Sequence, residues 1–376
     1  MKMSLLVGLF FQVPAVAYAT TPSSPNPSDS RSSRVVSDAE RHARRCQFRY
    51  DHRIDRIQGT MGRIRGKPQG TMLWGTRRDW DSEKVVDERN SVLVSVGLEP
   101  MRQSNAQVKV LKLEGGHLVA TPAPARATPA ARGVVGTVLQ GLASDNTPVE
   151  VAICGAEPSS EDPSMVWYRI EAWNAVAQEW ENPCVALDRV PDPRAIALSG
   201  VWDTSGAHHE APDRLTFACE NGALTKCTRW GYKPWESRDG HSLADLHQAC
   251  TRMARADYCG NGLNHTPEDT AIDMYDRIGL LKRTLESTVD WDLSRASFEA
   301  AWAPDGATCL ARTRDDRAMT TILQECPTRF RMAEALSLGE GDTCTMQRTD
   351  VSPTTAVLRN LSYGARKGTV SQGVEL

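Results

Sequence analysis

Residues 247–276 read HQACTRMARADYCGNGLNHTPEDTAIDMYD, and this stretch decides how the second half of the chain is interpreted. It places two cysteines, Cys250 and Cys259, and two histidines, His247 and His265, close together. The first half of the stretch has apolar residues at helical spacing, and its middle is polar. The stretch therefore predicts the cysteine-rich centre of a domain, built from a helix and a polar loop.

The helix in this stretch has signals for its start and its end. Ser242 precedes Leu243, and an acidic residue stands three positions after the serine, which is a variant of the capping box. One face of the helix is apolar and includes Cys250, so this cysteine is expected to be buried. The helix should stop near Tyr258, before Gly260.

A second, shorter helix is predicted over residues 223–230, with Asn221 as its N-cap. The rival interpretation is a hairpin that turns on Asn221 and Gly222. In the helix Cys227 lies on the apolar stripe, and in the hairpin it lies on the opposite face from Cys219. Both interpretations argue against a disulfide between these two cysteines.

The first half of the chain is predicted to contain mainly short strands. Residues 149–153 and 167–173 alternate with a period of two, which is typical of a half-buried strand. Residues 272–274, after the polar loop, are predicted to form another strand. The expected fold class is therefore α+β, with a β-rich N-terminal domain over residues 46–197 and a disulfide-stapled α+β domain over residues 198–345.

The amino terminus has the three parts of a secretory signal peptide. Lys2 is followed by an apolar run over residues 5–13 and by an A-x-A site at residues 17–19. The run is shorter than the ~20 residues that a membrane-spanning helix needs. The first cysteine is Cys46, so no lipobox is present. We expect cleavage after Ala19 and a secreted or periplasmic protein without a transmembrane segment.

The segment after the signal peptide is rich in Pro and Ser and then becomes basic. Residues 20–33 have almost nothing to bury, so we predict a disordered basic leader over residues 20–45 and, at the other end, a C-terminal tail over residues 346–376. Eleven Lys and Arg residues lie between Arg31 and Lys67, against four acids. Without interleaved aromatics or a recognisable motif, this patch does not predict nucleic-acid binding.

The even number of cysteines in an exported chain indicates disulfides, because oxidising compartments preserve them. No pair has C-x-x-C spacing, so neither a zinc knuckle nor a thioredoxin-like motif is predicted. The sequence does not determine the pairing. The ten cysteines are Cys46, Cys154, Cys184, Cys219, Cys227, Cys250, Cys259, Cys309, Cys326 and Cys344.

The chain also has ten tryptophans, which is a large number for 376 residues. Exposed tryptophans could stack on sugar rings, whereas buried ones would fill cores around the disulfides. We expect burial, with Trp235, which follows Pro234 in a turn, as the exception.

The tetrapeptide Ala256-Asp257-Tyr258-Cys259 is the centre of a wider set of motifs between residues 198 and 330. With these motifs the chain resembles the ADYC domain family, an uncharacterised group of exported bacterial proteins. The resemblance implies export and a cysteine-stapled fold, and it brings no known activity. The other residues that carry it include Gly200-Val201-Trp202-Asp203, Phe217-Ala218-Cys219, Gly231-Tyr232-Lys233-Pro234-Trp235, His247-Gln248-Ala249-Cys250-Thr251-Arg252, His265-Thr266 and Cys326-Pro327.

Two catalytic hypotheses arise from this segment. A thiol dyad would use His247 and Cys250, which share one helical face, but in an oxidising compartment Cys250 is expected to be a disulfide sulfur. A hydrolase would use His265 or His247 as general base, with Asp257 tuning the base. No nucleophile elbow and no H-E-x-x-H motif accompany them. The competing interpretation is that His247 is a core histidine and the loop residues brace one another.

A calcium site is the third chemical hypothesis, because the polar loop offers the oxygen ligands that this ion prefers. The spacing of these residues matches no EF-hand, and we predict neither a metal nor a cofactor. The oxygen donors are Asn261, Asn264, Glu268, Asp269 and Asp273.

The leading hypothesis is a non-catalytic exported module that binds a cell-surface glycan or a protein, in the periplasm or at the bacterial cell surface. It is based on the export signal, the cysteines and the missing catalytic motif. The alternative is an extracytoplasmic hydrolase centred on His247, Asp257 and His265.

Overall fold

The structure is a computed structural model, which describes residues 36–47, 72–77, 80, 90–101, 108–121, 133–187, 190–267 and 270–363. The predicted signal peptide, most of the predicted leader and residues 364–376 lie outside the described residues. Residues Ser37–Leu376 form one compact unit. Its described parts contain four α-helices and nineteen strands.

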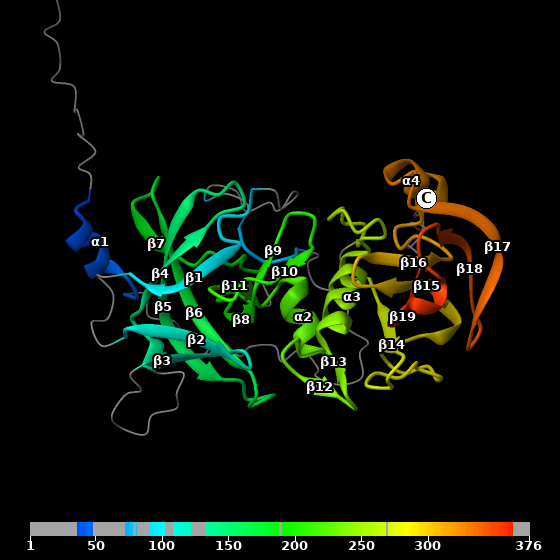
Figure 1. Cartoon of the computed structure of the whole chain (residues 1–376), viewed down its shortest axis with the longest axis horizontal. Coiled ribbons are helices and arrows are strands. Elements are labelled where there is room, and N and C mark those ends of the chain that lie inside the picture. Colours follow the sequence, from blue (N-terminus) through cyan, green and yellow to red (C-terminus); the bar gives the residue numbers. More distant parts are fainter. Residues whose placement is uncertain are drawn as a thin grey trace, which may run out of the picture. The chain divides into compact units, whose positions relative to one another are not determined.

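The first sheet closes on itself as a six-stranded barrel (Figure 1). Its strand order is β5-β4-β1-β11-β8-β6, the pairing of β5 with β6 closes it, and β7 extends it beyond β6. In the closing pair, Val151 lies opposite Ala172 and Pro158 lies opposite Val166. The strands are β1 (Ser95–Pro100), β4 (Val138–Leu142), β5 (Pro148–Pro158), β6 (Val166–Asn174), β7 (Glu179–Glu181), β8 (Ala195–Ser199) and β11 (Arg214–Cys219).

Apolar side chains fill the interior of the barrel, and Tyr168 and Phe217 pack with 5.8 Å between their ring centroids. A hairpin of β2 (Val110–Glu114) and β3 (His117–Thr121) packs on β1 and β8. The backbone N–H of Leu118 donates to the hydroxyl of Tyr168 at 2.7 Å, which ties the hairpin to β6.

The predicted strands at residues 149–153 and 167–173 are confirmed as parts of β5 and β6. The prediction that the second of them is half-buried is wrong, because both of its faces are covered. Arg169 and Glu171, on the face away from the barrel interior, are 8% and 1% exposed. The alternation correctly predicts which residues of β6 share a face, but it does not reveal that the polar face is buried as well.

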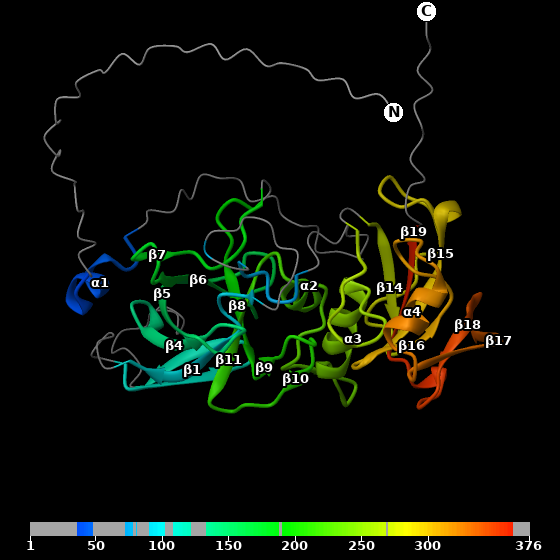
Figure 2. The ribbon, with the colours of Figure 1, turned by 90° about the horizontal axis from the view of Figure 1, so that it is seen from above.

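The second sheet is antiparallel and has the strand order β14-β19-β15-β16-β18-β17. Figure 2 shows it in yellow to red, at the end of the molecule away from the barrel. The predicted strand at residues 272–274 is confirmed as part of β14. The strands are β14 (Ile272–Asp276), β15 (Ala296–Ala303), β16 (Gly306–Leu310), β17 (Phe330–Gly339), β18 (Asp342–Arg348) and β19 (Leu358–Tyr363).

Two helices lie between the two sheets (Figure 1). Helix α2 packs on β11 and on α3, and α3 packs on β15, β16 and β19. The helices are α1 (Asp38–Arg44), α2 (Ala223–Arg229), α3 (Ala244–Arg255) and α4 (Met319–Glu325), with 3-10 turns η3 (Leu293–Arg295) and η4 (Pro353–Thr355). Two short strand pairs flank α2 and α3, namely β9 (Val201–Trp202) with β10 (His208–His209) and β12 (Ser237–Arg238) with β13 (His241–Ser242).

The expected fold class, with an α+β second domain, is wrong. The protein is β-rich throughout, and α3 is the only one of the four described α-helices that is longer than seven residues. The error arises downstream of residue 296, where five strands form most of the second sheet. Their sequences contain many Ala, Met, Glu and Leu residues, which favour helices by propensity, so tertiary packing overrides the local preference.

The predicted helix at residues 223–230 is confirmed as α2, and the rival hairpin is wrong. Asn221 is not its N-cap. Gly222 takes that position, and the side chain of Asn221 donates to the carbonyl of Val185 at 2.7 Å instead. The side-chain amide of Asn221, which the sequence pattern assigned to the helix N-cap, thus bonds to a neighbouring loop instead.

The basic leader is ordered at its end. Residues Asp38–Arg44 form α1, which begins with a capping box between Ser37 and Glu40. The prediction of disorder up to residue 45 is therefore wrong for this part, because the local capping signal is followed by contacts with the barrel. Among the described residues, no helix is long and apolar enough to cross a membrane.

Candidate functional site

Helix α3 ends in a left-handed residue that turns the chain into the ADYC segment. Ala256 has φ 50° and ψ 40°, and its N–H donates to the carbonyls of Arg252 and Met253. A non-glycine residue in this conformation is strained and persists only where its surroundings hold it. The helix thus stops at Arg255, earlier than the predicted end near Tyr258.

Asp257 is fully buried and holds the loop that follows. Its carboxylate accepts from the guanidinium of Arg252 at 2.5 Å and from the backbone N–H groups of Asn261 and Gly262 at 3.0 Å each. All three donors belong to α3 or to the loop that follows it. The carboxylate therefore braces the turn after α3 and makes no contact with His265 that would orient its ring.

The loop packs against the turn between β15 and β16 without space for a side chain. Gly260 has φ 67°, and a Cβ at this position would lie 1.9 Å from the carbonyl oxygen of Asp305. The N–H of Ala307 donates to the carbonyl of Tyr258 at 3.0 Å. Only glycine fits at position 260 for both reasons, the backbone conformation and the close approach.

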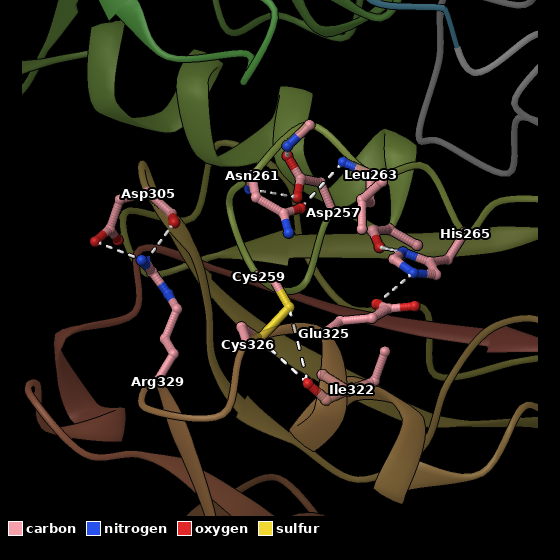
Figure 3. Close-up of a disulfide and its surroundings, with 12 residues drawn as sticks. Asp257, Cys259, Asn261, Leu263, His265, Asp305, Ile322, Glu325, Cys326 and Arg329 are labelled. Atoms are coloured by element: carbon pink, nitrogen blue, oxygen red, sulfur yellow. Dashed lines mark hydrogen bonds and ion pairs between the residues drawn. A yellow bond between two sulfur atoms is a disulfide. The ribbon is translucent and has the colours of Figure 1, made fainter. Parts of the chain in front are cut away.

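His265 is held from both sides of its ring (Figure 3). Nδ1 lies 2.9 Å from the carbonyl oxygen of Ala256, and Nε2 lies 2.9 Å from a carboxylate oxygen of Glu325 at the end of α4. The side chain is 2% exposed. Both ring nitrogens are therefore engaged by neighbouring oxygens, and neither is free to act as a general base.

Tyr258 connects this segment to a buried ion pair. Its hydroxyl donates to Glu299 at 3.1 Å and accepts from the N–H of Arg314 at 2.7 Å, and its ring stacks on Trp302. Burial and the neighbouring Glu299 carboxylate raise the pKa of Tyr258 well above its usual value. The tyrosine is therefore a neutral hydrogen-bonding group of the core.

Glu299 and Arg314 are both fully buried and bonded to each other through two nitrogens, at 3.0 and 2.9 Å. Burial alone would raise the pKa of Glu299, but the charge and hydrogen bonds of Arg314 hold it below its usual value. Arg314 also donates to the carbonyl of Ala254 at 3.2 Å and to the hydroxyl of Thr266 at 2.8 Å. The pair thus joins the end of α3 to the second sheet.

Sequence reasoning missed Glu299, Arg314 and Glu325, which come from distant parts of the chain. Glu299 had a usable signal, because it is a single acid in the apolar run of β15 and such a charge needs a buried partner. The identity of that partner depends on the tertiary fold.

His247 belongs to a different environment. It is buried on α3, its Nε2 lies 2.9 Å from the carbonyl oxygen of Leu224, and its ring packs edge-on against Trp202. Burial lowers the pKa of His247 to about 4, so the ring is neutral near pH 7. Asp257 bonds to Arg252 and to the loop after α3, and His265 bonds to Ala256 and Glu325. The hydrogen bonds of the three candidate catalytic residues therefore go to different partners.

The ten cysteines form five disulfides, and none is free. The prediction of disulfides is confirmed, as is the exclusion of a Cys219–Cys227 bridge. Because Cys250 is bonded to Cys227, a thiol dyad with His247 is excluded. The pairs are Cys46–Cys154, Cys184–Cys219, Cys227–Cys250, Cys259–Cys326 and Cys309–Cys344.

The proposed calcium ligands do not converge in the part of the chain that the structure describes. The side-chain oxygens of Asn261 and Asn264 accept from backbone N–H groups two residues on, and Asp273 accepts from Thr284. Glu268 and Asp269 lie outside the described residues. The one group of metal-ligand type found among the described residues contains the Cys46–Cys154 disulfide, whose sulfurs are bonded to each other.

The tryptophans are covered as predicted. All ten lie within the described residues, six are buried and four are half-buried. Trp235, the expected exception, is half-buried because its ring packs over the turn of the β2–β3 hairpin. A Cβ on Gly116 in that turn would lie 2.9 Å from the ring.

These features define a β-rich, disulfide-stapled protein, in which a buried polar network anchors a helix to a sheet. Five disulfides are compatible with an extracytoplasmic location. Residues 131–316 match the ADYC domain, and the chain belongs to the ADYC domain family. The match begins upstream of residue 198 and includes strands of both sheets.

No curated protein and no solved structure matches the chain. The domain boundary at residues 197 and 198 stays a prediction.

Proposed function

We propose that this chain is an exported, non-catalytic module that binds a protein partner in the bacterial periplasm or at the cell surface. The main support for the proposal is that the candidate catalytic side chains are bonded to, or buried in, the fold. Both ring nitrogens of His265 and both carboxylate oxygens of Asp257 are engaged by the fold, and His247 is a buried core residue. The ADYC segment accordingly acts as a structural anchor.

A protein is favoured over a glycan as the partner because no tryptophan is exposed to stack on sugar rings. The loop between β14 and η3 offers an apolar surface instead. Leu285 is 77% exposed and Val289 is fully exposed. The roots of this loop are fixed, since Asp276 accepts from three of its backbone N–H groups and Trp291 is buried at its end. A loop with fixed ends and two exposed apolar side chains is suited to docking on a protein.

The hydrolase alternative is tested with the purified mature protein and its His265→Ala variant. Both are assayed against chromogenic esters, peptides and glycosides, and circular dichroism and thermal unfolding report on the fold. We expect no turnover by either protein and a lower melting temperature for the variant. Turnover that the variant loses while its melting temperature stays unchanged would support the hydrolase instead.

The partner surface is tested by site-specific photo-crosslinking in intact cells, with a photoreactive amino acid at position 285. Position 176 serves as the matched control, because Val176 is 79% exposed on a different loop. A discrete adduct at position 285 that is absent at position 176 is expected. Equal labelling at both positions, or no adduct, contradicts partner binding through this loop.

The export proposal depends on residues 1–19, which lie outside the described residues. Cell fractionation and sequencing of the mature amino terminus test it. We expect the protein in the periplasm or the medium, beginning at Thr20. An uncleaved cytoplasmic protein with free thiols would contradict it.

A further inference from the structure

Helix α1 covers the outer side of the barrel through polar contacts. The guanidinium of Arg41 forms an ion pair with Glu150 at 2.8 Å and lies over the ring of Trp173, and the indole N–H of Trp180 donates to the carbonyl of Arg41 at 2.7 Å. Two residues beyond the helix, Cys46 is bonded to Cys154 of β5. The helix is thus joined to β5, β6 and β7.

Helix α1 itself contributes little apolar surface to this docking. Within α1 the only buried side chain is that of His42, and Ala39 and Ala43 are both exposed. A seven-residue helix is marginal by itself, and most helices in proteins are stabilised by packing an apolar face. Helix α1 has no such face.

The contact also leaves buried polar atoms without hydrogen bonds. Both ring nitrogens of His42, Nε of Arg41 and one carboxylate oxygen of Glu150 are buried and make no hydrogen bond, and Nε2 of His42 lies 3.7 Å from that oxygen of Glu150. These four atoms are one third of the twelve such side-chain atoms found among the described residues. Unsatisfied buried groups destabilise the state that buries them, so the docked position of α1 is unfavourable at these atoms.

The disulfide that holds the helix is more accessible than most of the others. Cys46 and Cys154 are both half-buried, whereas six of the remaining cysteines are at most 1% exposed. Cys259 is 3% exposed and its partner Cys326 is half-buried, so that pair is intermediate. Thiol–disulfide exchange needs access of a thiolate to one sulfur.

We infer that α1 is a redox-sensitive strap, held on the barrel by the Cys46–Cys154 disulfide and released when this bond is reduced. A dithiol reductant attacks one of the two sulfurs, the mixed disulfide resolves, and the products are two cysteine thiols and the oxidised cyclic disulfide of the reductant. Release uncovers Trp180 and Glu150 and gives water access to the four polar atoms that make no hydrogen bond in the docked position. The barrel keeps its fold, because its core and the Cys184–Cys219 disulfide are separate from the strap.

The first test treats the intact protein with increasing concentrations of dithiothreitol under native conditions, followed by alkylation and peptide mass spectrometry. Cys46 and Cys154 should be labelled first, Cys259 and Cys326 second, and the six buried cysteines last. If any of the three buried disulfides reacts before Cys46–Cys154, the inference fails.

The second test uses the Cys46→Ser, Cys154→Ser double variant without reductant and measures hydrogen exchange by mass spectrometry. Peptides from residues 36–47 should exchange about tenfold faster or more than in the parent, while peptides from β4, β6 and β11 stay unchanged. Added dithiothreitol should change α1 no further in this variant. Unchanged protection of α1 overturns the inference, and so does faster exchange throughout the barrel, which would make the disulfide a staple of the whole domain.

Discussion

Glu299 and Arg314 form an ion pair in which neither side chain is exposed to solvent, with 2.9 Å between Glu299 Oε1 and Arg314 Nη2. The other polar positions of the pair are also used. Tyr258 and Asn360 donate to Glu299, and Arg314 donates to the carbonyl of Ala254. The tyrosine of the ADYC segment is therefore one member of a fully bonded network that connects α3, β15 and β19.

The Glu299→Gln substitution should lower the free energy of unfolding by about 3–5 kcal/mol, because it leaves the buried charge of Arg314 without its counter-ion. Urea denaturation followed by circular dichroism measures the change. The Tyr258→Phe variant, which removes one hydroxyl, is the control and should lose only about 1–3 kcal/mol. A loss below about 1 kcal/mol for Glu299→Gln would show that the charge of Arg314 is not buried.

The part of the fold that the sequence predicts is the part with strong local signals. The period-two alternation identified β5 and β6, and the residues at its start and end identified α2. None of these local signals indicated that β5 pairs with β6 to close a barrel. In β17 the run Met332–Leu336 consists of good helix formers, yet it pairs with β18. Local propensity is weak against the packing of a whole sheet.

The sequence singled out the segment that contains Asp257 and His265, but it gave no indication of the groups that bond to these side chains. Asp257 bonds to Arg252, and His265 bonds to Glu325. A histidine near several acids has the same pattern whether it is catalytic or structural. Only the positions of the hydrogen-bond partners distinguish the two, and Glu325 comes from a helix sixty residues downstream.

The free energy of unfolding should decrease as the pH is lowered, because His247 is protonated more readily in the unfolded chain. Burial lowers the pKa of this residue from 6.5 to about 4, so the unfolded chain takes up the proton first as the pH falls. The stabilisation is complete above pH 6.5 and is lost progressively down to about pH 4, by a total of about 3 kcal/mol. Urea denaturation at intervals between pH 4 and pH 8 measures this dependence.

The control for this pH dependence is His247→Gln, which keeps a donor for the carbonyl of Leu224 and does not titrate. In this variant the loss of stability between pH 6.5 and about pH 4 that His247 causes should disappear, although the overall stability is lower. If the parent and the variant show the same dependence in that window, His247 is not the group responsible.

Gly260→Ala should destabilise the protein by at least about 2 kcal/mol, since the new Cβ meets the backbone of Asp305 and the residue has positive φ. Gly279→Ala is the matched control. Gly279 has φ 69°, nearly the same as the 67° of Gly260, but nothing lies within 4 Å of its Cβ position. The control should lose about 1 kcal/mol through the backbone conformation alone. Equal losses in thermal or urea unfolding would mean that the close approach to Asp305 contributes nothing.

The pair of His265 and Glu325 should show a coupling free energy of about 1–3 kcal/mol in a double-mutant cycle with His265→Gln and Glu325→Gln. The reason is that the histidine is 2% exposed and the hydrogen bond of 2.9 Å is shielded from water. Glu325 also pairs with Arg317 at 2.9 Å, but Arg317 is 33% exposed. A second cycle with Arg317→Gln is therefore the control, and it should give less than about 1 kcal/mol because the pair is solvated. Urea denaturation of the single and double variants supplies both cycles. Equal coupling in the two cycles would mean that Glu325 is a surface acid and that His265 is not anchored by α4.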